Sequence, residues 1–134
     1  MKVLVATEKP FSKAAVDGIR TIVEEAGYEL ALLEKYTDVQ QFYDAVADAD
    51  ALIVRSDKVT KEVIDHANNL KIVVRAGAGF DNLDLAACTA KNIVAMNTPG
   101  QNSNAVAELA IGMMIYMARN TFKPGTGCEF SDSV

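Results

Sequence analysis

ALIVRSD, residues 51–57, is the stretch of sequence that decides the fold. Its first four residues are all apolar, which is typical of a strand buried on both faces of a parallel sheet. Comparable short runs occur at residues 3–5, 29–33, 71–74 and 93–96, and longer amphipathic segments separate them. This alternation predicts an α/β fold, a flavodoxin-like, doubly wound parallel sheet of five strands.

The segments between these runs have apolar residues at helical spacing. Ser12 is expected to cap the first helix, Thr37 or Asp38 the second and Thr60 the third, and a short fourth helix is expected over residues 83–90. The inward stripes predicted for the first three helices are Ala15, Val16, Ile19, Ile22, Val23 and Ala26; Val39, Phe42, Val46 and Ala49; and Val63, Ile64 and Ala67.

Residues 105–120 are predicted to form one long helix that is apolar nearly all round, with Glu108 as its only acid. Such a helix needs a partner on every side, so we expect it to dock on another domain or another subunit. The sequence therefore divides into a domain over residues 1–98, a helical segment over residues 99–120 and a tail over residues 121–134, which we expect to be loose.

Composition excludes several classes of protein. The 134 residues are 50% hydrophobic and 23% charged, with a net charge of −5 and no basic block, which disfavours a nucleic-acid-binding protein. Cys88 and Cys128 are far apart and form no metal-binding or disulfide motif, so a reducing cytoplasm is the expected location. The longest apolar stretch, residues 109–118, is shorter than the roughly 20 residues of a membrane span.

Polar residues follow two of the predicted strands at the edge where parallel sheets bind ligands. Arg55 and Ser56 follow residue 54, and Arg75 is followed by the glycine turn of Gly77, Ala78 and Gly79. Two guanidinium groups beside a turn with free N–H groups predict a site for a small anion. The helix start at Asn102 could add further donors.

Other interpretations of the same residues remain open. Each arginine taken singly could be a surface charge, and the glycine turn lacks the third glycine of a dinucleotide site, where Asn82 stands. Asp57 follows the third strand as a receiver-type phosphoacceptor would, but only Glu8 offers an acidic group after the first strand. His66 and Cys88 are interpreted as an exposed helix residue and a core residue. A non-catalytic module that binds a small phosphorylated acid is the alternative function.

Three motifs together carry a resemblance to a known family. RSDKVT (55–60), VRAGAGFDNLD (74–84) and NTPGQNSNAVAEL (97–109) closely resemble the amino-terminal part of the D-2-hydroxyacid dehydrogenases, and in particular their phosphoglycerate branch. The resemblance implies a substrate site in which Arg55, Arg75 and Asn102 hold the phosphate, while backbone amides at residues 77–79 hold the carboxylate. Ser56 is counted with this site.

The resemblance also implies what the complete proteins do. They oxidise a hydroxyacid, here 3-phosphoglycerate on the way to L-serine, with NAD, and they form homodimers through the helix at residues 105–120, which begins the nucleotide-binding domain. Family members are at least twice as long, and their remaining part carries the dinucleotide motif and the catalytic arginine, glutamate and histidine. We therefore expect this chain to bind no NAD, to hold no catalytic residue or metal, and to be inactive alone.

Overall fold

The computed structural model describes residues 1–119, and the chain divides into a first compact unit, Met1–Gln101, and a second that begins at Asn102. The first unit is built on a five-stranded sheet in the order β2-β1-β3-β4-β5, with every pair parallel. This topology confirms the predicted flavodoxin-like α/β fold. The strands are β1 (Lys2–Thr7), β2 (Glu29–Glu34), β3 (Ala51–Val54), β4 (Ile72–Arg75) and β5 (Val94–Asn97).

Four helices connect the strands of the first unit. They are α1 (Lys13–Glu25), α2 (Val39–Val46), α3 (Lys61–His66) and α4 (Leu85–Ala90). The side chains of Ser12, Asp38 and Asp84 accept hydrogen bonds from the first turns of α1, α2 and α4, so each of these helices begins at a residue that satisfies one of its free N–H groups. Thr60 holds the cap position of α3, but its side chain accepts no capping hydrogen bond from the helix.

The register of the strands places the largest cluster of buried residues on one face of the sheet. Leu4, Leu52, Val73 and Ala95 stand side by side across β1, β3, β4 and β5. The first three are buried and pack in one cluster with residues of α2, α3 and α4, chiefly Phe42, Val46, Val63, Ile64 and Cys88. Because side chains alternate along a strand, Arg75 points to the same face as Val73, one step beyond the core at the carboxyl edge.

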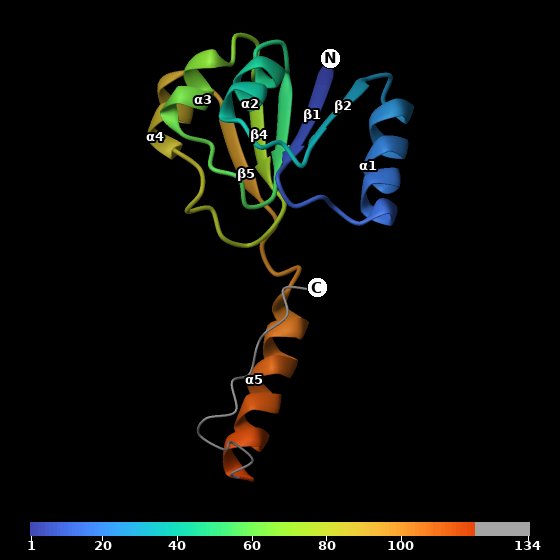
Figure 1. The fold of residues 1–134 in the computed structure, drawn as a ribbon, viewed down its shortest axis with the longest axis vertical. Helices are drawn as coiled ribbons and strands as arrows, with labels where there is room; N and C mark the ends of the chain where they lie inside the picture. The colour runs from blue at the N-terminus through green and yellow to red at the C-terminus, as the bar shows by residue number, and fades with distance from the viewer. Residues whose placement is uncertain (120–134) are drawn as a thin grey trace. The chain divides into compact units, whose positions relative to one another are not determined.

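The stripe predicted for α1 is wrong in part. Of its six residues only Val23 is buried, Val16 and Ile19 are half-buried, and Ile22 is 69% exposed. The reason is the position of α1, which lies beside the edge strand β2 and apart from the other helices (Figure 1), so only a narrow line of its surface is covered.

Two further residues are more exposed than their patterns suggest. Val39, predicted to face inward, is 52% exposed, because it stands in the first turn of α2 at the border of a cavity. Met96 of β5 is 51% exposed, since β5 is the edge strand farthest from α1 in the sheet order.

The second unit contains helix α5 (Ser103–Ala118), which starts two residues before the expected position. Asn102 holds its cap position, and no residue of the helix is buried. Within residues 1–119, no helix combines the length and the apolar character that a membrane crossing requires. The tail expected at residues 121–134 lies outside the described residues.

Candidate functional site

Arg75 and Arg55 meet at the carboxyl edge of the sheet, as the sequence predicts. Arg75 is the last residue of β4 rather than the first residue after it, which corrects the predicted end of that strand. Its Nε–H donates to the backbone carbonyl of Arg55 at 2.9 Å. The strand ladder continues one residue further, because the N–H of Ala76 donates to the carbonyl of Val54. The two arginines are therefore fixed to each other through backbone and side chain.

The glycine turn accommodates the Arg75 side chain. A Cβ atom added to Gly77 would lie 1.6 Å from Nη1 and 2.4 Å from Cζ of Arg75, so only glycine leaves room for the guanidinium in this position. The N–H of Gly77 donates to the Arg75 carbonyl at 2.9 Å and is not free to bind a ligand, contrary to the prediction. The N–H groups of Ala78 and Gly79 have no acceptor among residues 1–119.

Asn97, at the end of β5, stabilises the glycine turn at residues 77–79. Its side-chain amide donates to the carbonyl of Ala78 at 2.8 Å, and the next N–H, that of Thr98, donates to the carbonyl of Gly77 at 3.0 Å. Sequence reasoning missed this role of Asn97. The signal was its place at a strand end next to β4, which is the same signal that identified the arginines.

The charge of the arginine pair is uncompensated in the part of the chain that the structure describes. No carboxylate of residues 1–119 forms an ion pair with Arg55 or Arg75. Both residues are half-buried, which reduces the screening of their charge by water. Two guanidinium groups in this setting suit a carboxylate or a phosphate group.

Comparison with known proteins shows which family the chain belongs to. The family model for the catalytic domain of D-isomer specific 2-hydroxyacid dehydrogenases matches residues 6–130. The chain belongs to this family. Its members are oxidoreductases, and two of the three relatives described next are 3-phosphoglycerate dehydrogenases.

Two curated relatives and one solved structure illustrate the likeness. D-3-phosphoglycerate dehydrogenase of Methanocaldococcus jannaschii is 44% identical over 100 residues, 74% of this chain and 19% of that protein. Hydroxypyruvate reductase of Thermotoga maritima is 40% identical over 93 residues, 69% of this chain and 30% of that protein. The NAD⁺-bound 3-phosphoglycerate dehydrogenase of Entamoeba histolytica has a TM-score of 0.84 and 54% identity, covering 98% of this chain and 44% of that chain. The chain thus spans less than half of each relative.

The glycine turn of this family member does not fit a dinucleotide. In a dinucleotide site the turn leads directly into a helix whose N-terminus receives the pyrophosphate. Here the turn at Gly77 is filled by the Arg75 guanidinium, and the next helix, α4, begins only at Leu85. NAD is bound in solved structures of two relatives. The glycine turn at Gly77 does not have the geometry to bind it.

Asp57 is a buried junction between the loops at the strand ends. Its Oδ1 accepts from the N–H of Glu8 at 2.8 Å and from the hydroxyl of Tyr36 at 2.7 Å, and its carbonyl accepts from the side chain of Asn82 at 2.8 Å. Burial, together with the hydrogen bond to Asp57, raises the pKa of Tyr36, so its hydroxyl stays a donor. This arrangement does not suit a phosphoacceptor, and sequence reasoning missed it.

The remaining candidates have other surroundings. Cys88 is buried in the core, and burial raises the pKa of its thiol, which does not favour a role as a nucleophile. His66 lies at the end of α3, where its Nδ1 is 2.8 Å from the carbonyl of Glu62 and its ring stacks on Tyr43. Ser56 is exposed beside Arg55. Asn102 belongs to the second unit, so its grouping with the arginines stays a prediction.

Residues 1–119 contain no cluster of three or more histidine, cysteine, aspartate or glutamate side chains that could hold a metal ion. Within those residues, this edge of the sheet offers a ligand the guanidinium groups of Arg55 and Arg75 and the N–H groups of Ala78 and Gly79.

Proposed function

We propose that residues 1–98 form the substrate-binding domain of a D-3-phosphoglycerate dehydrogenase, which oxidises 3-phosphoglycerate to 3-phosphohydroxypyruvate with NAD. The observation that carries this proposal is the Arg55–Arg75 pair, joined by the bond from Nε of Arg75 and free of carboxylate partners among residues 1–119. The chain is 44% identical to phosphoglycerate dehydrogenases over about three quarters of its length, which supports the choice of substrate.

The two ends of 3-phosphoglycerate match the two parts of the site. The phosphate carries the larger charge and suits the guanidinium groups of Arg55 and Arg75, which can bind two oxygens each. The carboxylate suits the free N–H groups of Ala78 and Gly79. Ser56 and Asn102 are proposed as further contacts at the same phosphate.

We further propose that the chain does not catalyse the reaction by itself. Hydride transfer requires the nicotinamide ring to be held against the substrate carbon and a group to move the alcohol proton. The glycine turn does not fit NAD, and the single histidine, His66, stacks on Tyr43 rather than facing the arginines. Binding of substrate without turnover is the expected behaviour.

A two-dimensional amide NMR titration of the 134-residue chain tests the proposal. With 3-phosphoglycerate we expect shifts at Arg55, Arg75, Ala78 and Gly79, because the anion contacts these groups, and weaker shifts with unphosphorylated glycerate. Adding NAD⁺ should produce no NADH absorbance. Equal shifts with glycerate would contradict a phosphate site, and turnover would contradict inactivity. Equal binding of unrelated phosphorylated acids would favour the alternative, a non-catalytic module for small anions.

We also propose that α5 mediates formation of a homodimer. Apolar side chains point outward around the whole helix, and even the least exposed of Val106, Leu109, Ile111, Met113, Met114, Ile115 and Met117 is 56% exposed. Isolated monomers rarely leave such a surface in water. Light scattering should give about twice the 14.4 kDa monomer mass, and Met114→Glu should shift it toward the monomer. A monomeric mass at high concentration would contradict the proposal.

The place of the reaction in serine synthesis and a cytoplasmic location stay predictions from the sequence. Their support is the same family membership together with the likeness to phosphoglycerate dehydrogenases.

A further inference from the structure

A cavity of about 610 Å³ opens at the carboxyl ends of β1 and β3. Its wall includes Thr7, Lys9, Ser56 and Lys58 but neither Arg55, Arg75 nor the glycine turn. In the strand order 2-1-3-4-5 these two strands are the point at which the order reverses, which is where sheets of this kind bind their ligands. The volume also lies within the range of about 300–1,000 Å³ typical of small-molecule sites. The position and size of the cavity thus point to a ligand other than the anion at the arginine pair.

One wall of the cavity is aromatic. The rings of Tyr36 and Phe42 lie 5.6 Å apart at a tilt of 43°, and Tyr43 stands next along α2. The Tyr43 ring is held by stacking on His66, with 4.3 Å between ring centroids and 4° between planes. Such a wall favours a ligand that brings a ring or another large apolar group.

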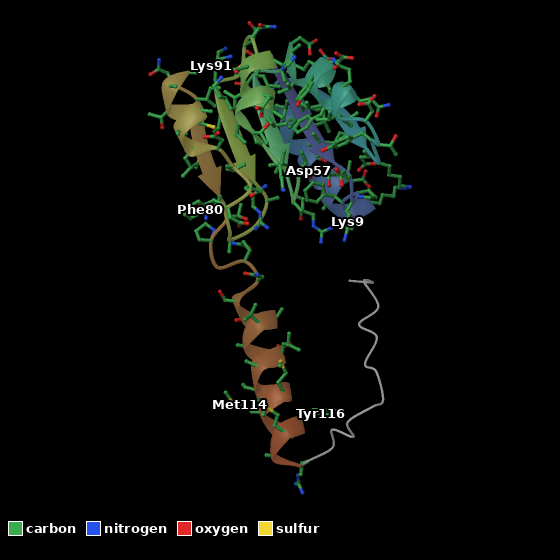
Figure 2. All side chains as sticks on the ribbon, turned by 60° about the vertical axis from the view of Figure 1, so that its left-hand side comes forward. Lys9, Asp57, Phe80, Lys91, Met114 and Tyr116 are labelled. Atoms are coloured by element: carbon green, nitrogen blue, oxygen red, sulfur yellow. The ribbon has the colours of Figure 1, made fainter. Side chains whose placement is uncertain are left out.

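The polar wall carries charges of both signs. The ammonium groups of Lys9 and Lys58 form no ion pair within residues 1–119, whereas Glu8, Asp57 and Glu62 contribute carboxylates. Figure 2 shows Lys9 and Asp57 at the same end of the first unit. Because the wall has two ammonium groups and three carboxylates, its net charge is negative. It would repel a simple anion such as a phosphorylated acid.

One carboxylate oxygen of Asp57, Oδ2, accepts no hydrogen bond from the described residues. Its Oδ1 accepts both hydrogen bonds, from Glu8 and from Tyr36, and Oδ2 has no donor among the described residues. No buried side-chain oxygen or nitrogen among these residues lacks a partner, so Oδ2 is open to solvent and can accept from a ligand. A carboxylate of which nine-tenths is covered binds an ammonium group more strongly than an exposed one does.

We propose that this cavity binds a zwitterion of the amino-acid class, an α-amino acid with an aromatic side chain. Its ammonium group faces Oδ2 of Asp57, its carboxylate faces Lys9 and Lys58, and its ring packs against Tyr36 and Tyr43. The three contacts use the three features of the wall, and no single-charge ligand satisfies all of them. This site shares Ser56 with the proposed phosphoglycerate site, but Arg55, Arg75 and the glycine turn do not line the cavity, so the two sites can be tested apart.

An amide NMR titration of the 134-residue chain with L-phenylalanine as the probe tests this inference. Shifts are expected at Lys9, Tyr36, Asp57 and Lys58. Phenylacetate, which lacks the ammonium group, and phenethylamine, which lacks the carboxylate, should each bind roughly tenfold more weakly or worse, because each loses a charge-assisted contact.

A pair of matched variants locates the site. Lys58→Met keeps most of the side-chain bulk, lies on the surface, and should weaken binding of L-phenylalanine by roughly tenfold. Lys13→Met, in the first turn of α1 and away from the cavity wall, should leave the affinity unchanged.

Three results would overturn the inference. The first is the lack of any shift with L-phenylalanine up to about 10 mM, a range that detects millimolar affinity. The second is equal affinity for all three probes, which would mean that the charged groups play no part. The third is a set of shifts centred on Arg75 and Gly79, which would place the probe in the arginine site. Binding of 3-phosphoglycerate is followed by the shifts of Arg55 and Arg75, which do not line the cavity. The failure of one proposal can therefore be told apart from the failure of the other.

Discussion

Replacing Arg75 with alanine is expected to weaken binding of 3-phosphoglycerate to the chain by roughly 10- to 100-fold, which corresponds to about 1.5–3 kcal/mol for a charge-assisted contact. The change removes one of the two guanidinium groups and also the bond from Nε to the carbonyl of Arg55. Arg55 then loses the contact that ties its loop to β4. Isothermal titration calorimetry of the variant and the parent chain measures the effect.

Two companion variants make this prediction specific. Gly77→Ala keeps both arginines, but its new Cβ would stand 1.6 Å from Nη1 of Arg75, so the guanidinium must move away and binding should weaken in the same direction. Arg20→Ala removes a guanidinium from α1 that pairs only with Glu24, within the described residues, and should leave binding unchanged. An Arg75→Ala chain with the affinity of the parent would place Arg75 outside the anion site.

Replacing Phe42 with alanine should lower the free energy of unfolding by about 3–5 kcal/mol, the cost usually found when a buried aromatic ring is removed. Phe42 is 1% exposed and is the largest fully buried side chain among residues 1–119. It packs in the core cluster with Leu4, Leu52 and Val63, so its loss leaves a void that these neighbours cannot fill without moving.

Urea unfolding followed by circular dichroism measures this change. Val39→Ala is the matched control, because Val39 lies on the same helix and is 52% exposed, and it should cost less than about 1 kcal/mol. A loss below about 1 kcal/mol in Phe42→Ala would show that the core cluster is not the main source of stability.

The strands of this protein could be predicted because their composition leaves little choice. The run at residues 51–54 has no polar residue, and β3 spans those same four positions. The caps at Ser12 and Asp38 could also be predicted, since a short polar side chain before an amphipathic segment has few other roles. Local sequence is sufficient where the physical cause is itself local.

The stripe of α1 could not be predicted in full for the opposite reason. The apolar residues Ile22 and Ala26 have helical spacing, but their exposure depends on which strand the helix covers. A helix beside an edge strand buries a narrower line than one over the sheet centre. The spacing of apolar residues along the chain does not show whether a helix covers an edge strand or the centre of the sheet.

The candidate site was predictable as a location but not as a set of bonds. The strand-end rule placed Arg55 and Arg75 together, and the structure joins them at 2.9 Å. The same rule did not predict that Gly77 uses its own N–H internally, or that Asp57 receives bonds from residues 49 and 21 positions away. Contacts between residues so far apart in the chain exist only once the sheet has formed.

The loop after β3 belongs to both sites at once. Arg55 belongs to the arginine pair, Lys58 lines the cavity, and Asp57 is anchored between them to the loops after β1 and β2. A ligand that moves this short segment at one of the two sites therefore changes the free energy of binding at the other site. By thermodynamic linkage the two effects must be equal: whatever factor an occupant of the cavity imposes on the affinity for the anion, the anion imposes on the affinity for that occupant.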